Sequence, residues 1–246
     1  MQPRPRLAVP ELFLGLLAIG VAVVVTARIF SDTVKEVRHT RDTITVSGSA
    51  RKPISANLVR WDVYIRGEAP QRTVAAKRLR VDSATVRSFL IREGIPSDAI
   101  SSSVVSSEVV VERISKRRRR ITYRVSQGLE VSTREIDVVA RAATRIGVLI
   151  EQGIDVSPEP LAYISTELSQ AKLDALEAAT AEARRRAEIL LHGLGGKLGP
   201  MRSTSQGVYQ ITPRDSNEVS DYGINDTSSR EKDVNAVVSA TFAVKR

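Results

Sequence analysis

The stretch AATAEARRRAEILLHGLGGKLG, residues 178–199, contains the end of the longest predicted helix and the turn that follows it. Ser169 is placed to cap the N-terminus of this helix, which is expected to extend to Leu194. Helical spacing predicts one buried face, formed by Leu173, Leu176, Ala183, Ala187, Leu190 and Leu194. The glycines follow a helix instead of opening one, and Lys197 is followed by Leu198, not by the Ser or Thr of a Walker motif. The stretch therefore predicts a helix C-cap and a turn, in preference to a phosphate-binding loop.

Two more helices are predicted on the N-terminal side of this stretch, over 71–93 and 135–152. Gly94 and Pro96 end the first of them. Seven segments have the alternation or the β-branched content of strands: 43–48, 59–66, 103–114, 121–131, 161–167, 201–211 and 234–244. Trp61, in the second segment, is expected to lie in the core. The segment 212–233 has almost no apolar content and is expected to be a mobile polar loop.

The order of these elements contains two β-α-β-β units, near 57–132 and near 159–244, joined by the middle helix. Helices on one face of a mostly antiparallel sheet would bury their apolar stripes. The sequence therefore predicts an α+β domain over 43–246, preceded by a polar linker over 31–42.

The composition excludes several kinds of site. The chain has 246 residues, 42% of them hydrophobic, which is enough for a core. It has no cysteine, so disulfides, thiolate metal sites, a cysteine nucleophile and a lipidated cysteine are excluded. Its two histidines are His39, in the linker, and His192, near the end of the long helix, where a cation is favoured.

No catalytic motif is evident. The chain lacks a G-x-S-x-G elbow, and two histidines far apart in sequence predict neither a metal site nor an acid–base pair. Two pairs of carboxylates have a spacing that would suit acid–base catalysis: Glu108 with Glu112, and Asp174 with Glu177. Both pairs have arginines nearby in the sequence, so we expect them to be solvated surface side chains. We therefore expect no enzyme and no cofactor, with a hydrolase that uses Ser, Asp or Glu as the weaker alternative.

The net charge is +9, and most arginines are scattered singly among acidic residues. The one cluster lies between two predicted strands and is expected at a hairpin tip; its members are Lys116, Arg117, Arg118, Arg119 and Arg120. This cluster is a candidate site for phosphate, anionic lipid headgroups or an acidic partner, although a solvated hairpin tip explains it equally well. Nucleic-acid binding is disfavoured, because an arginine-rich composition gives the same total charge.

The N-terminus predicts a membrane segment. Arg4 and Arg6 precede the apolar run LFLGLLAIGVAVVVTA, residues 12–27, which is followed by Arg28. A helix of this run covers about 24 Å, and residues 28–30 extend it toward the roughly 30 Å of a bilayer core. We expect residues 1–30 to form an uncleaved transmembrane signal anchor that contacts the membrane through residues 12–30. A signal peptide cleaved after Ala27 is the alternative, and a buried core helix is a third.

Three motifs resemble those of the SIMPL family of bacterial envelope proteins. The sequence ITVSG, residues 44–48, is similar to the I-x-V-x-G opening strand of the family, and GIPSDAIS, residues 94–101, is similar to the turn after its first helix. Residues 178–199 resemble its alanine-rich helix with a closing L-G-x-x-L-G. The resemblance covers 43–246, although residues 184–186 are all arginine where members often mix Arg, Ala and Lys, and 116–120 is unusually basic.

This resemblance implies a SIMPL-like fold in a periplasmic or membrane-attached protein with no established catalytic activity. Some members look like ring- or channel-like homo-oligomers, and some are linked to oxidative-stress tolerance. We therefore expect a single-pass protein of the inner membrane whose domain lies in the periplasm, self-associates and supports envelope integrity or stress defence. A protein secreted to the periplasm after signal cleavage and a module that binds polyanions or lipid headgroups through 116–120 are the alternatives.

Overall fold

A computed structural model describes residues 26, 42–115 and 118–245. The predicted anchor, apart from Thr26, and the predicted linker, apart from Asp42, lie outside these residues. Within the described part of the chain, no helix is both long enough and apolar enough to cross a membrane.

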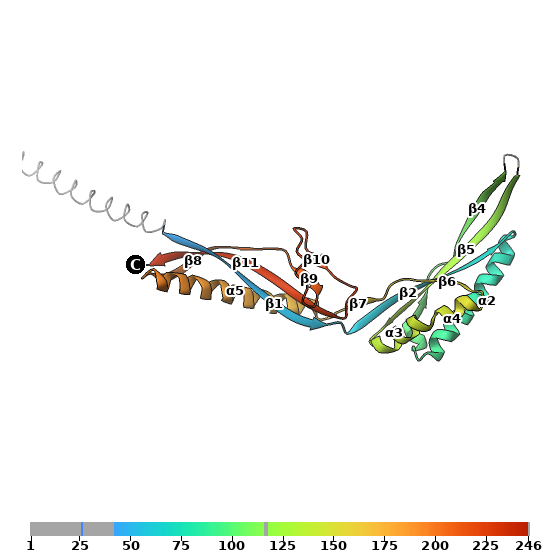
Figure 1. Ribbon diagram of the computed structural model, residues 1–246, viewed down its shortest axis with the longest axis horizontal. Helices are drawn as coiled ribbons and strands as arrows, with labels where there is room; N and C mark the ends of the chain where they lie inside the picture. Colours follow the sequence, from blue (N-terminus) through green and yellow to red (C-terminus); the bar gives the residue numbers. More distant parts are fainter. Residues whose placement is uncertain (1–25, 27–41, 116–117, 246) are drawn as a thin grey trace, which may run out of the picture. The chain divides into compact units, whose positions relative to one another are not determined.

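The structure is α+β, as predicted, with more strand than helix (Figure 1). The first two predicted helices begin one residue after their expected starts, and the middle one is divided into two. The long helix begins at Leu168, so Ser169 lies inside it and the predicted N-cap is wrong. The elements in chain order are β1 Thr43–Ser55, β2 Leu58–Ala69, α2 Arg72–Arg92, a 3₁₀ turn Ser97–Ala99, β3 Ile100–Ser102, β4 Ser106–Ser115, β5 Arg118–Thr133, α3 Ile136–Arg145, α4 Gly147–Glu151, β6 Asp155–Pro158, β7 Ala162–Ile164, α5 Leu168–Gly193, β8 Lys197–Gln206, β9 Gln210–Pro213, β10 Ile224–Asn225 and β11 Glu231–Lys245.

The strands form two sheets, where the sequence predicted one. One sheet has the order β1-β11-β9-β10, and β8 also pairs with β11. The other has the order β3-β5-β2-β6, with β4 paired to β5 and β7 paired to β2. The pairings of the second sheet are antiparallel, whereas β9 and β10 pair parallel.

The chain divides into two compact units. The larger unit holds Ala50–Ala178 and Val208–Val237, and the smaller holds the described parts of Met1–Ser49, Ala179–Gly207 and Val238–Arg246. Strands β1 and β11 and helix α5 each contribute residues to both units. The family-like segment 43–246 therefore contains two units, and its outer boundaries stay a prediction.

In the larger unit, three helices cover one face of the β3-β5-β2-β6 sheet. The predicted alternation of β2 is confirmed, because Val59, Trp61, Val63 and Ile65 are buried. They share one core with the buried residues of α2, α3 and α4. The indole Nε1 of Trp61 donates to the carbonyl oxygen of Glu159 at 3.0 Å, so the largest core side chain leaves no polar atom without a partner.

In the smaller unit, the α5 backbone lies directly against β1. A Cβ atom on Gly48 would lie 2.2 Å from the Ala179 carbonyl oxygen and 2.4 Å from the Ala183 nitrogen. Only glycine leaves room for this approach, which explains why the opening I-x-V-x-G motif ends in glycine. Val46, Ala183, Ala187, Ala240 and Phe242 form the core beside it.

The predicted buried face of α5 is partly wrong. Ala183 and Ala187 are buried as expected, but the residues that share their face are spaced by four and mostly alanine: Ala171, Ala175, Ala179 and Leu191. Leu173, Leu190 and Leu194 are exposed instead. Where the helix lies against Gly48, at Ala179 and Ala183, its backbone is too close to the strand for large side chains, so alanine replaces leucine there.

The predicted turn after α5 is confirmed. Gly195 has a φ of 71°, and the Gly196 amide donates to the Leu191 carbonyl oxygen at 2.9 Å. These features are typical of a helix C-terminus that ends on a left-handed glycine.

Candidate functional site

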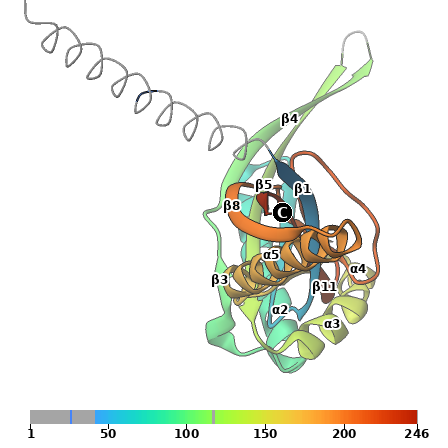
Figure 2. The same ribbon diagram turned by 90° about the vertical axis from the view of Figure 1, so that its left-hand side faces the viewer.

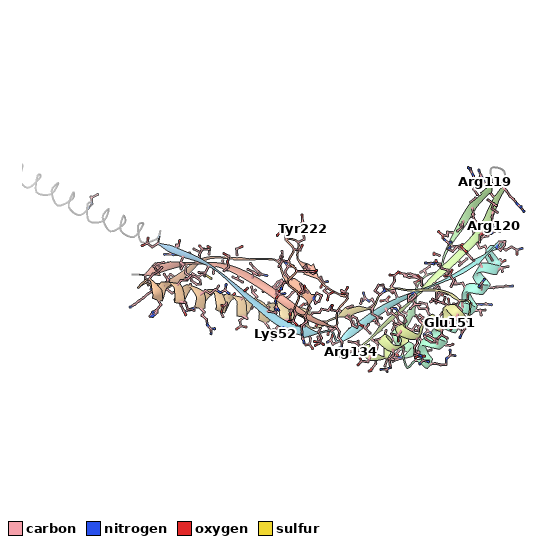
Figure 3. All side chains as sticks on the ribbon, in the orientation of Figure 1. Lys52, Arg119, Arg120, Arg134, Glu151 and Tyr222 are labelled. Carbon is pink, nitrogen blue, oxygen red and sulfur yellow. The ribbon has the colours of Figure 1, made fainter. Side chains whose placement is uncertain are left out.

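The basic cluster lies on the β4–β5 hairpin, as the sequence predicted. Strand β4 ends at Ser115 and β5 begins at Arg118, and these two residues are opposite each other in an antiparallel ladder. Lys116 and Arg117 lie outside the described residues. Because β2 ends opposite Tyr123, the two strands continue beyond it as a ribbon (Figures 1 and 2), and Arg119 and Arg120 lie near its end (Figure 3).

The ladder divides the side chains of the hairpin between two faces, because opposite residues of an antiparallel pair point to the same side. We call one the charged face; it comprises Glu108, Val110, Glu112, Arg120, Thr122 and Arg124. We call the other the apolar face; it comprises Val109, Val111, Arg113, Arg119, Ile121 and Tyr123. The apolar face continues the side of β5 on which Val125, Leu129 and Val131 are buried.

The cations of the charged face have carboxylate partners. Arg124 lies between Glu68 and Glu108, with nitrogen–oxygen distances of 2.6 and 2.9 Å. The hydrogen bonds to Glu108 and Glu68 raise the pKa of Arg124. Arg120 forms a looser pair with Glu112 at 3.9 Å. The expected solvated role of Glu108 and Glu112 is confirmed, because both are exposed and both face arginines.

The apolar face has a different character. Val111 and Ile121 are opposite each other, and they are 55% and 53% exposed. One step closer to the tip, Arg113 is directly opposite Arg119, and within the described part of the chain neither has an ion-pair partner. Like charges opposite each other on one face destabilise a ladder.

Toward the body of the unit, the apolar face is better covered. The guanidinium of Arg72, the first residue of α2, lies over the Tyr123 ring at 5.2 Å from its centroid. Beyond Tyr123 the alternation of β5 continues to Ile121, which is 53% exposed.

A second polar cluster lies in the segment that was predicted to be a loop. The segment 212–233 includes the end of β9, all of β10 and the start of β11, and Thr212, Lys232 and Asp233 are buried. The Lys232 amine, 3% exposed, donates to the carbonyl oxygens of Tyr163, at 2.7 Å, and Asp226. Lys232 lies on the same face of β11 as the buried Ala236 and Val238, because the three residues are an even number of positions apart. This alternation is the feature of the sequence that could have predicted the burial of Lys232.

The charge of Lys232 is only partly compensated. Burial lowers the pKa of Lys232, and the carboxylate of Asp226, with its Oδ2 at 4.0 Å, partly offsets this effect. Burial also acts to raise the pKa of Asp226, but hydrogen bonds from Ser228 and the charge of Lys232 outweigh it, and the pKa is lowered. The amine is thus held by protein acceptors, and its role is structural.

A cavity of about 210 Å³ lies beside this lysine in the larger unit. Its lining combines apolar side chains with polar residues; the apolar ones are Ile54, Ile164, Leu168 and Ile211, and the polar ones include Asn225, Asp226 and Thr227. Its volume is small for a ligand pocket. Together with the occupied amine, this size gives no support to a catalytic lysine.

The other candidate residues do not converge on a site. His192 is exposed in the last turn of α5, and His39 lies outside the described residues. Asp174 accepts hydrogen bonds from Gln170 and Lys52, which lower its pKa. Within 42–115 and 118–245, no group of His, Asp and Glu side chains is arranged to hold a metal ion.

Comparison with known proteins gives one family. The model of the SIMPL family, described as "Protein of unknown function (DUF541)", matches residues 44–242. No curated protein matches the chain. A de novo designed protein, Foldit4, is 13% identical over 44% of this chain and 98% of its own, with a TM-score of 0.21. A protein named as an amidohydrolase/peptidase from Burkholderia cenocepacia is 12% identical over 57% of this chain and 36% of its own, with a TM-score of 0.20.

At these TM-scores neither solved structure carries an argument about fold or function. The family match, in contrast, covers most of the chain and includes ITVSG, GIPSDAIS and the alanine-rich helix. The chain therefore belongs to the SIMPL family.

Proposed function

We propose that the chain is a non-enzymatic protein of the cell envelope, tethered to the inner membrane by residues 12–30, with its SIMPL domain in the periplasm. The apolar run that precedes the family segment supports the tether. In this proposal the domain self-associates and supports envelope integrity or oxidative-stress defence. Secretion to the periplasm after signal cleavage is the alternative for its location.

One observation carries the proposal of self-association. Leu190 lies in the last turns of α5, and Leu194 follows the helix end at Gly193. They are 50% and 81% exposed, and Ile189 beside them is exposed as well. Neighbouring large apolar side chains left in water favour a protein partner, and a second copy of the chain is the partner always at hand.

Light scattering of the full chain in a mild detergent tests this proposal. The unmodified chain should form an oligomer, and the double change Leu190→Gln with Leu194→Gln should shift it toward the monomer. Leu173→Gln is the matched control, because Leu173 lies on the same helix and is exposed to a similar degree. A strict monomer of the unmodified chain at high concentration would contradict self-association.

The second candidate function is the binding of an anionic ligand by the basic hairpin. The observation that favours it is the pair formed by Arg113 and Arg119, two cations that face each other without a described carboxylate. Replacing residues 116–120 with serine should remove salt-dependent binding to anionic lipid or nucleic acid. Unchanged binding would reject this function.

A further inference from the structure

The geometry points to a lipid-binding surface on the apolar face of the hairpin: we propose that Val111, Ile121 and the Arg113–Arg119 pair dock flat on an anionic bilayer surface. This inference extends the second candidate function, anion binding by the hairpin, because it names the binding face and the ligand. It rests on the proposed function only in assuming that the protein is held near a membrane. It assigns the binding to one face of the ribbon and not to the basic cluster as a whole.

The first argument is the contrast between the two faces. On the charged face Arg120 and Arg124 have carboxylate partners, so their charges are already offset. On the apolar face Arg113 and Arg119 oppose each other with no such partner among the described residues. An anion placed between them would convert a repulsive rung into a bridged one.

The second argument is what lies next to these cations. Val111 and Ile121 form the adjacent rung of the same face, and each is about half exposed. Ile114, which sits at the irregularity between Arg113 and Ser115, is also half exposed. The face therefore offers apolar side chains and unpaired cations within two rungs of the ladder.

A bilayer surface with anionic lipids offers binding partners both for the unpaired cations and for the exposed apolar side chains of this face. Phosphate headgroups attract arginine, and the boundary of the acyl chains accepts valine and isoleucine. A nucleic acid would instead favour cations interleaved with aromatic rings, and the only aromatic ring on this face, Tyr123, is already in contact with Arg72. The charge and the apolar rung together thus favour lipid over nucleic acid.

The chain permits a clean test, because it has no cysteine of its own. Val111→Cys and Val110→Cys place a single label on opposite faces at adjacent positions of β4. The full chain, carrying an environment-sensitive dye at one position, is reconstituted into phosphatidylcholine vesicles with or without phosphatidylglycerol. A lipid-borne quencher then reports contact of the dye with the bilayer.

We expect quenching at position 111 and not at position 110, and only when phosphatidylglycerol is present. Changing Arg113 and Arg119 to Gln should weaken the contact about thirty-fold, since each cation near an anionic surface contributes about 1 kcal/mol. The same charge change at Arg120 and Arg124, which lie on the charged face and have carboxylate partners, is the matched control and should have a smaller effect.

Three outcomes would overturn the inference. One is no quenching at position 111, another is equal quenching at both positions, and the third is an equal effect of the two arginine pairs. Dye–dye contact at position 111 without lipid quenching would assign the face to a second copy of the chain instead. Flotation of the vesicles measures the tether separately, so failure of the membrane anchor is distinguished from failure of the hairpin contact.

Discussion

The close approach of α5 to β1 leads to a sharp prediction about Gly48. In Gly48→Ala, the new methyl group would lie 2.2 Å from the Ala179 carbonyl oxygen and 2.4 Å from the Ala183 nitrogen. Both atoms belong to the helix backbone, which cannot rotate away as a side chain can. To restore ordinary contact, this part of α5 must retreat from the strand by about 1 Å, and its buried alanines would lose contact with it.

Overpacking of this kind costs typically about 1–3 kcal/mol, and we expect the upper end because the whole helix must move. For a chain of this length, about 3 kcal/mol corresponds to a fall of about 6–12 °C in the melting temperature. Far-ultraviolet circular dichroism of the full chain in a mild detergent measures this fall. Gly193→Ala, in the same unit, is the control, since nothing lies within 4 Å of its Cβ position. If the two variants melt at the same temperature, the close-approach argument is wrong.

Three more changes test the packing of the larger unit. Gly67→Ala should lower the free energy of unfolding by about 1–3 kcal/mol, because its Cβ would lie 2.5 Å from a carbonyl oxygen of α2; Gly147→Ala, with nothing within 4 Å, should cause no loss. Lys232→Met removes both hydrogen bonds of the buried amine and should cost about 2–3 kcal/mol in urea unfolding, and a neutral result would show that the amine is not structural. Burial raises the pKa of Asp82, so the folded state favours the protonated form and stability is lost as pH rises through that pKa. Asp82→Asn should therefore stabilise the protein near pH 7, and this gain should vanish in acid below the ordinary aspartate pKa; a gain that is the same at both pH values would contradict the assignment.

The elements were predictable wherever local pattern and burial agree. The alternation of β2 predicted a strand with one buried face, and Val59, Trp61, Val63 and Ile65 are buried. Helix ends at Gly94 and Gly195 were predicted from glycine, and both have a positive φ. These features depend on residues near in sequence, which is why the sequence alone predicts them.

The errors have a different cause. Leucine is buried in protein cores more readily than alanine, so it was expected on the buried face of α5. Which residues are buried there depends instead on the distance between α5 and the strand backbone. That distance is set by Gly48, which is far away in the sequence. Lys232 stands in a polar segment, and its burial depends on carbonyl acceptors that include Tyr163, on another strand. The division of the strands into two sheets also depends on long-range pairing, which alternation does not specify.

The sequence predicted where the candidate site lies, but not which side chains share a face of the hairpin. The cluster at 116–120 predicted a basic hairpin, whereas the pairing register shows which cations share a face with Val111 and Ile121. Arg113 was not singled out from the sequence, because it precedes the cluster and becomes significant only opposite Arg119. A one-residue change of register would have moved it to the other face.

The central claim is that this SIMPL protein stays tethered to the membrane by its own N-terminal segment. Cell fractionation followed by N-terminal sequencing of the mature protein tests it most directly. The account predicts a protein in the inner-membrane fraction whose sequence begins at Met1 or Gln2. A soluble periplasmic protein that begins at Arg28, after cleavage at Ala27, would contradict the tether, and a protein found in the cytoplasm would contradict the envelope location as well.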